Sequence, residues 1–208
     1  MLTELSAFSC IVPAIIGTVK YKRVDNKFHP FIWIIYLSVI TETSVFIVKQ
    51  LKQLRPAYFI VGNCYYIINI VLLLEFFRRL LIIQRTVSLL LTAICLLTLI
   101  VLSCFFPPTQ NLLLNATVVY DAILLALTVN LLSKQVLVFN IPFYKNVLFI
   151  ISSMLLFYTA FSFFLNVIYL LQLKSEFNNF LFGIHKYVNL VTYLVFAWAL
   201  ICIPSKSI

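Results

Sequence analysis

Residues 111–133 read NLLLNATVVYDAILLALTVNLLS, an apolar run in which Asp121 is the one charged residue. A helix of this length can cross a bilayer, whose hydrocarbon core is about 30 Å thick. A carboxylate near the middle of such a helix is costly, so we expect it to face a protein interior or a water-filled cavity and to have a partner. The stretch therefore predicts a membrane helix with a functional or pairing site at Asp121.

The composition of the whole chain agrees with this reading. The 208 residues are 63% hydrophobic and 10% charged, and their mean hydropathy is +1.10. A soluble domain is roughly half apolar and about one quarter charged. The composition therefore predicts an integral membrane protein, with the lipid bilayer as its first partner.

Apolar runs separated by charged or proline-containing links predict an all-α, polytopic transmembrane helix bundle. We expect a single membrane domain over residues 1–208, without a soluble domain. The seven expected helices lie at about 5–19, 31–48, 57–77, 86–106, 111–133, 146–173 and 179–203. The first run is short and contains Pro13, but the residues before it are acidic, unlike a signal peptide. It is interpreted as a crossing that is kinked or thinned at Pro13.

The basic residues predict the orientation of this bundle. Ten lie in the links after the first, third and fifth runs and in the C-terminal tail, namely Lys20, Lys22, Arg23, Lys27, Arg78, Arg79, Arg85, Lys134, Lys145 and Lys206. Five lie on the opposite side, namely Lys49, Lys52, Arg55, Lys174 and Lys186. An excess of Lys and Arg marks the cytoplasmic side, so we expect the N-terminus outside and the C-terminus inside. If the first run does not span, six crossings remain and both termini lie inside. The positive charge is thus explained by topology, and no nucleic-acid partner is expected.

Polar residues from several of the expected helices fall at similar depth in the outer half of the bundle. They are Glu42, Asn63, Tyr66, Asp121, Asn166, His185, Lys186 and Asn189. One interpretation is a polar pocket for a small-molecule ligand or a proton, with Lys186 or His185 paired to Glu42 or Asp121. The other is that each group satisfies a local neighbour and that Lys186 extends to the interface.

Glu75 has Arg78 three residues later and Arg79 four residues later. This spacing places the three side chains on one face of a helix. It predicts a structural ion pair near the inner interface, and the alternative is a contact with a cytoplasmic partner.

The chain lacks the usual sequence patterns of catalysis and metal binding. Its two histidines, His29 and His185, have no neighbouring ligands at metal spacing. There is no Gly-x-Ser-x-Gly elbow and no glycine-rich phosphate loop. We therefore assign no catalytic residue, no metal and no cofactor, and we favour a non-enzymatic protein. Cys10 and Cys64 fall toward the same membrane face, which leaves a disulfide between them open.

Several short motifs resemble a known group of proteins. They are Pro13–Gly17, Glu42, Tyr65–Tyr66, Leu74–Arg78, Ile141–Tyr144 and Gly183–Asn189. With these motifs the chain resembles small bacterial seven-helix membrane proteins that are related to the membrane part of seven-helix sensors. The resemblance implies a multi-pass protein of the bacterial inner membrane and a role in sensing.

The leading functional hypothesis is a receptor-like, sensor-like or accessory membrane protein with a polar pocket in its outer half. A cytoplasmic or membrane signalling partner would then receive the change through the basic inner loops. The second hypothesis is a small-solute or proton-coupled transporter. The third is an intramembrane enzyme that modifies lipids.

Overall fold

The computed structural model of the chain describes residues 2–50, 55–105, 110–136, 142–171 and 175–204. These residues form helices joined by short turns, and no β-strand occurs among them. The α-helices are α1 (Leu2–Phe8), α2 (Ile11–Lys20), α3 (His29–Gln50), α4 (Arg55–Arg79), α5 (Arg85–Phe105), α6 (Gln110–Val136), α7 (Val147–Leu170) and α8 (Ser175–Cys202). Three 3-10 turns are described, η1 (Tyr21–Arg23), η2 (Asn26–Phe28) and η4 (Phe143–Lys145). The expected all-α class is confirmed.

Within the described residues, four helical segments are long and apolar enough to cross a membrane. They are Asn26–Val48, Thr117–Val136, Val147–Leu170 and Gly183–Cys202. Many side chains on their outer faces are large and apolar, such as Phe157 and Phe164 on α7 and Leu194 on α8. A soluble protein rarely exposes contiguous apolar surface of this kind. Length, composition and surface therefore all indicate a membrane protein.

The helices extend beyond the apolar runs from which they were expected. α4 begins at Arg55 and ends at Arg79, and α6 continues to Val136. α8 begins at Ser175, four residues before the expected start at about Asn179. The physical reason is that charged and polar residues continue a helical backbone past its apolar part, so hydropathy underestimates helix length.

The first expected helix is not one helix. α1 and α2 are separated by a break at Ser9 and Cys10, not at Pro13 itself. Pro13 has no N–H to donate to the carbonyl of Ser9, and its ring crowds that carbonyl. The Ser9 carbonyl instead accepts from the N–H of Val12 at 3.4 Å. Pro13 thus interrupts the helix one turn before its own position.

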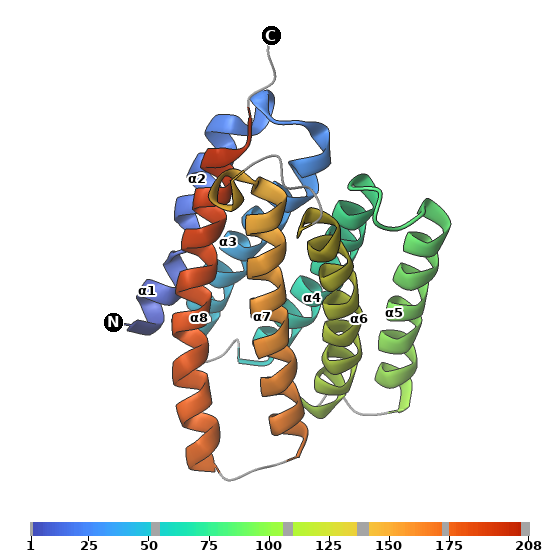
Figure 1. Cartoon of the computed structure of the whole chain (residues 1–208). Coiled ribbons are helices and arrows are strands. Elements are labelled where there is room, and N and C mark those ends of the chain that lie inside the picture. Colours follow the sequence, from blue (N-terminus) through green and yellow to red (C-terminus); the bar gives the residue numbers. More distant parts are fainter. Residues whose placement is uncertain (1, 51–54, 106–109, 137–141, 172–174, 205–208) are drawn as a thin grey trace. The chain divides into compact units, whose positions relative to one another are not determined.

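Packing divides the chain into two compact units. In the first unit (Met1–Asp25 and Val118–Ile208), α1 and α2 pack along α8, and α8 packs against α7 (Figure 1). In the second unit (Asn26–Thr117), α4 packs between α3 and α5. α6 begins in the second unit and continues into the first.

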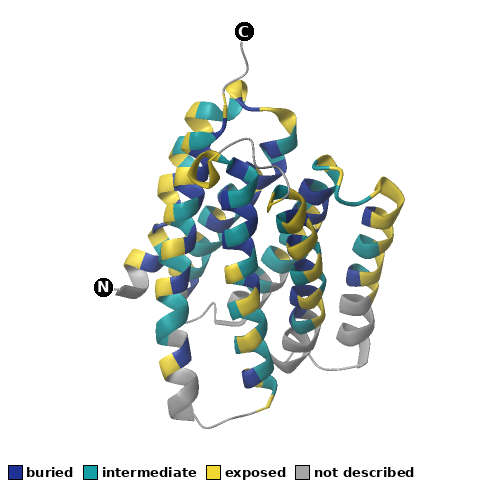
Figure 2. Ribbon diagram, in the orientation of Figure 1, coloured by how far each residue is buried: buried dark blue, intermediate teal, exposed yellow. Residues whose placement is uncertain are grey.

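Each unit has an apolar core made by helical stripes. On α7 the buried residues recur every three or four positions, from Val147 through Ile151 and Leu155 to Thr159, as expected for one face of a helix. Buried and exposed residues accordingly alternate around the helices (Figure 2). In the second unit Phe31 of α3 and Phe76 of α4 are fully buried, with ring centroids 5.7 Å apart.

Three buried threonines within the apolar helices donate hydrogen bonds to the backbone of their own helix. Thr128, Thr159 and Thr192 are buried, and each donates to the carbonyl of the residue four positions earlier, at 2.6, 2.7 and 2.7 Å. In a helix away from water, such a backward hydrogen bond provides the partner that a hydroxyl needs. These residues are therefore compatible with an apolar environment without a neighbouring helix.

Side-chain contacts fasten one end of the first unit. The ammonium group of Lys20, the last residue of α2, donates to the carbonyls of Ile201 at 2.6 Å and Ile203 at 3.2 Å. The indole Nε1 of Trp198 donates to the carbonyl of Tyr144 at 3.2 Å. At the start of α7, Asn146 accepts from the N–H of Phe149 at 3.1 Å and caps the helix. The end of α2, the end of α8 and the start of α7 therefore meet at the same end of this unit.

Candidate functional site

Asp121 is held by two side chains of the neighbouring helix. It lies in the candidate span Thr117–Val136 and is 4% exposed. Its Oδ2 atom accepts from Asn166 Nδ2 at 2.9 Å and from Ser162 Oγ at 3.1 Å. Ser162 and Asn166 are four residues apart on α7, so one face of that helix presents both donors.

The position of Asp121 follows from the pattern of α6. Its buried residues include Thr117, Tyr120, Leu124 and Thr128, which recur at three- and four-residue intervals around Asp121. A carboxylate in this stripe is carried toward the protein with its apolar neighbours and away from the exposed face.

The described partners of Asp121 are uncharged. Neither an amide nor a hydroxyl cancels the charge of a carboxylate, although each offsets part of the cost of removing it from water. No ion pair to Asp121 is found in the part of the chain that the structure covers. The arrangement therefore favours the binding of a proton or another cation at Oδ1 or Oδ2, because either would remove the remaining charge.

His185 lies on the other helix that packs against α7. Its ring is parallel to that of Phe161, with an interplanar angle of 8° and centroids 6.0 Å apart. The ring of Tyr158 is 6.1 Å away. The Nδ1 atom of His185 is buried and has no hydrogen-bond partner in the structure. Phe161 directly precedes Ser162, so α7 contacts both Asp121 of α6 and His185 of α8.

The structure brings together part of the expected polar cluster. Asp121 and Asn166 are in contact, and His185 lies against α7. Lys186 and Asn189 are half-buried on α8, while Glu42 and Tyr66 are half-buried in the second unit. The side chain of Asn63 lies outside the described residues. A pocket shared by all eight residues stays a prediction.

Ser162 was missed by reasoning from the sequence. Serine is common in membrane helices, and this one has no unusual neighbour. The available signal was its position four residues before Asn166, which puts both polar groups on one face of α7.

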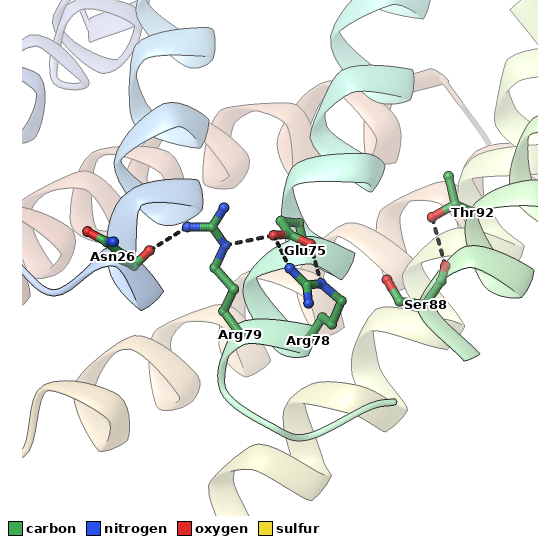
Figure 3. Close-up of polar contacts among 6 residues, drawn as sticks. All are labelled: Asn26, Glu75, Arg78, Arg79, Ser88 and Thr92. Carbon is green, nitrogen blue, oxygen red and sulfur yellow. Dashed lines mark hydrogen bonds and ion pairs between the residues drawn. The ribbon is translucent and has the colours of Figure 1, made fainter. Parts of the chain in front are cut away.

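Glu75 forms the second polar cluster (Figure 3). Its carboxylate accepts from Arg78 Nε at 2.5 Å, Arg78 Nη2 at 2.6 Å and Arg79 Nε at 2.7 Å. Arg79 Nη1 also donates to the carbonyl of Asn26 at 2.7 Å. The cluster thus has the geometry that the i+3 and i+4 spacing predicts. It fastens the end of α4 to η2, which directly precedes α3.

The cysteines and the other possible metal ligands are dispersed. Cys64, Cys95 and Cys202 are free thiols, and Cys10 donates to the carbonyl of Ala7. Within the described ranges, no three His, Cys, Asp or Glu side chains come close enough together to hold a metal ion.

Comparison with known proteins gives no further assignment. No family model matches the chain, and neither a curated protein nor a solved structure matches it. The geometry around Asp121 and the membrane character of the helices are therefore what indicates a function for this chain.

Proposed function

We propose that this chain is a receptor-like or sensor-like membrane protein in which Asp121 binds a proton or a small cationic ligand. The observation that carries the proposal is the buried carboxylate whose described partners, Ser162 and Asn166, are both neutral. An uncompensated charge in an apolar helix is costly, and a carboxylate that is kept there despite this cost commonly marks a binding or pairing site.

We further propose that the chain crosses the bacterial inner membrane seven times, with the N-terminus outside and the C-terminus inside. α4 and α5 have 25 and 21 residues, which at about 1.5 Å per residue suffices for a core of about 30 Å. Basic residues gather at one end of each unit, at Lys20, Lys22 and Lys145 in the first and at Lys27 and Arg79 in the second. Both ends would face the cytoplasm.

A path for the signal follows from the contacts within the first unit. Ligand binding at Asp121 would change its hydrogen bonds to Ser162 and Asn166, and hence the contact between α6 and α7. α7 packs on α8, and the end of α8 is held by Lys20 and by the turn before α7. A shift of α7 and α8 would therefore change the basic end, where a cytoplasmic or membrane signalling partner would bind.

Infrared difference spectroscopy of the purified protein tests the role of Asp121. A titration should reveal the C=O stretch of a protonated carboxylic acid, and Asp121→Asn should remove that band. Glu75→Gln serves as the control because it removes one carboxylate that is ion-paired with Arg78 and Arg79 and is not part of the proposed pocket. A band that persists in Asp121→Asn, or that is absent in the parent protein at every pH, would contradict the proposal for a proton.

Thiol labelling tests access to the site. Asp121→Cys is introduced into a variant whose native cysteines are replaced, and reporter tags are placed on both termini. A sensor predicts labelling at position 121 from outside, with opposite sides for the two termini. Labelling from both sides would favour the transporter hypothesis instead. If position 121 does not react at all, Asp121 is part of a buried structural contact and the binding role is contradicted.

A further inference from the structure

One end of the first unit carries exposed aromatic and basic side chains together. We name it the headgroup surface, made of Lys22, Arg23, Tyr144, Lys145 and Trp198. These residues come from η1, η4 and the end of α8, and all belong to the same compact unit. The end of α8 links η1 and η4, as can be followed in Figure 1.

Two described contacts bring these residues together. Trp198 donates its indole N–H to the carbonyl of Tyr144, which places η4 beside the end of α8. Lys20 donates to the carbonyls of Ile201 and Ile203, which places η1 beside the same helix end. Hydrogen bonds therefore place η1 and η4 at the same end of α8.

The cations of this surface are available to a ligand. Lys22 and Arg23 are exposed, and within the residues that the structure describes neither has a carboxylate partner. Lys145 is also exposed, and its ammonium lies 5.7 Å from the centre of the Tyr144 ring. Lys20 already satisfies the last carbonyls of α8, where the negative end of the helix dipole lies. Lys22 and Arg23 thus have no competing role at that helix end.

The aromatic residues indicate what kind of ligand the surface meets. Tyr144 is 61% and Trp198 50% exposed, although burial of such rings is favourable. Tryptophan and tyrosine gather where a membrane protein crosses the lipid headgroups. Basic groups at that depth attract anionic lipids, and the guanidinium of arginine matches a phosphate with two parallel hydrogen bonds.

We propose that the headgroup surface binds the phosphate of an anionic phospholipid, with Arg23 and Lys22 on the phosphate and Trp198 and Tyr144 against the glycerol and upper chain. Charge complementarity selects the lipid, because Lys22, Arg23 and Lys145 have no described carboxylate partner and lie at the same end of α8 as Tyr144 and Trp198. The site is separate from Asp121, and either proposal can fail without the other.

The chain contains two tryptophans, Trp33 and Trp198, which makes a direct test available. In a Trp33→Phe background, Trp198 is the sole intrinsic tryptophan. The protein is reconstituted in phosphatidylcholine vesicles that contain increasing fractions of brominated phosphatidylglycerol or brominated phosphatidylcholine. We expect brominated phosphatidylglycerol to quench Trp198 with an apparent affinity at least about fivefold higher, since each basic residue near the surface contributes about that factor.

A matched pair of double variants distinguishes a specific lipid site from a general attraction of the basic protein to anionic lipids. K22Q/R23Q removes two charges from the headgroup surface, whereas R85Q/K134Q removes two exposed charges elsewhere. The lipid preference should disappear in K22Q/R23Q and persist in R85Q/K134Q. If K22Q/R23Q does not fold by circular dichroism, K145Q carries the same test with an expected loss of about fivefold.

Three outcomes would overturn the proposal. The first is equal quenching by the two brominated lipids. The second is an equal loss of preference in both double variants, which would show attraction by net charge alone. The third is complete displacement of the lipid by millimolar inorganic phosphate, which would identify the ligand as a soluble phosphate.

Discussion

Asp121 illustrates how a single side chain ties two apolar helices together. Its Oδ2 atom accepts from both Ser162 and Asn166, at 3.1 and 2.9 Å. In a bilayer, hydrogen bonds between helices contribute about 0.6 kcal/mol on average and up to about 1.7 kcal/mol. A bond to a carboxylate is expected at the upper end of that range, because charge strengthens a hydrogen bond.

A double-mutant cycle between Asp121→Leu and Asn166→Leu should therefore show a coupling of about 1 kcal/mol. The Asn166→Leu variant alone should lower the free energy of unfolding, because it leaves Asp121 with fewer donors. The measurement is denaturant unfolding in detergent micelles, followed by circular dichroism.

Asn130→Leu is the control for this cycle. Asn130 lies on α6 within the same candidate span and its side chain is exposed. This variant should not lower stability, and its cycle with Asp121→Leu should be additive. Additivity in the Asn166 cycle would show that the hydrogen bond contributes nothing measurable.

The partners of Asp121 could be predicted from the sequence only in part. Helix rise predicted a similar depth for Asn166 and Asp121, which placed both among the candidates, and the two side chains are in contact. Depth does not give the direction of a side chain around its helix axis, however, and that direction selects Ser162 and Asn166. By contrast Glu75, Arg78 and Arg79 share one helix, so their spacing alone defined their geometry.

At the scale of single elements, the end of α4 has an unusual residue. The N–H of Ile82 donates to the carbonyl of Phe77 at 3.1 Å, and the N–H of Leu81 donates to the carbonyl of Arg78 at 3.0 Å. This is the pattern of a Schellman motif. Leu81 occupies its left-handed position with φ of 58° and is 86% exposed. Glycine is the usual residue there, because a Cβ atom costs about 1–2 kcal/mol in this conformation.

Leu81→Gly should therefore raise the free energy of unfolding by roughly 0.5–1 kcal/mol, since glycine removes the backbone strain but adds some flexibility to the unfolded chain. Thermal unfolding in detergent measures whether Leu81→Gly stabilises or destabilises the protein. Leu80→Gly is the control, because its backbone has no positive φ and the exchange should destabilise the helix end. A decrease in stability for Leu81→Gly would mean that its exposed side chain makes a compensating contact.

Lys20 stabilises the end of another helix. Its ammonium donates to the carbonyls of Ile201 and Ile203, which are among those left without partners where α8 ends. Lys20→Met should cost about 1 kcal/mol and should accelerate amide hydrogen exchange in the last turn of α8. Lys22→Met, from the adjacent turn, should leave that exchange unchanged. Equal exchange in both variants would contradict a capping role for Lys20.

The helices themselves were largely predictable, because hydropathy and charge define apolar segments of the required length. The ends of the helices were less predictable than the helices themselves. The break at Ser9 and Cys10 follows from Pro13, but the sequence alone did not place it one turn earlier than the proline. The start of α8 at Ser175 depends on polar residues that hydropathy assigns to a loop.

At the scale of the whole molecule, the two polar clusters belong to different compact units. The Glu75 cluster lies in the second unit and the Asp121 contacts in the first, and no described hydrogen bond is shared between them. Glu75→Gln and Asn166→Leu should therefore be additive within about 0.5 kcal/mol in the free energy of unfolding. A larger deviation, measured by the same denaturant unfolding, would reveal energetic coupling between the clusters.

The backward hydrogen bonds of the buried threonines have a consequence for biosynthesis. Thr128, Thr159 and Thr192 have their partners within their own helices, so each of these residues can leave the insertion machinery already satisfied. Asp121 cannot, because Ser162 and Asn166 follow it by 41 and 45 residues. If α6 and α7 cross the membrane as proposed, the nascent α6 must stay beside the translocon or in contact with water until α7 has been synthesised. Membrane integration of this chain is thus expected to proceed helix by helix except at α6 and α7, which should enter the lipid as a pair.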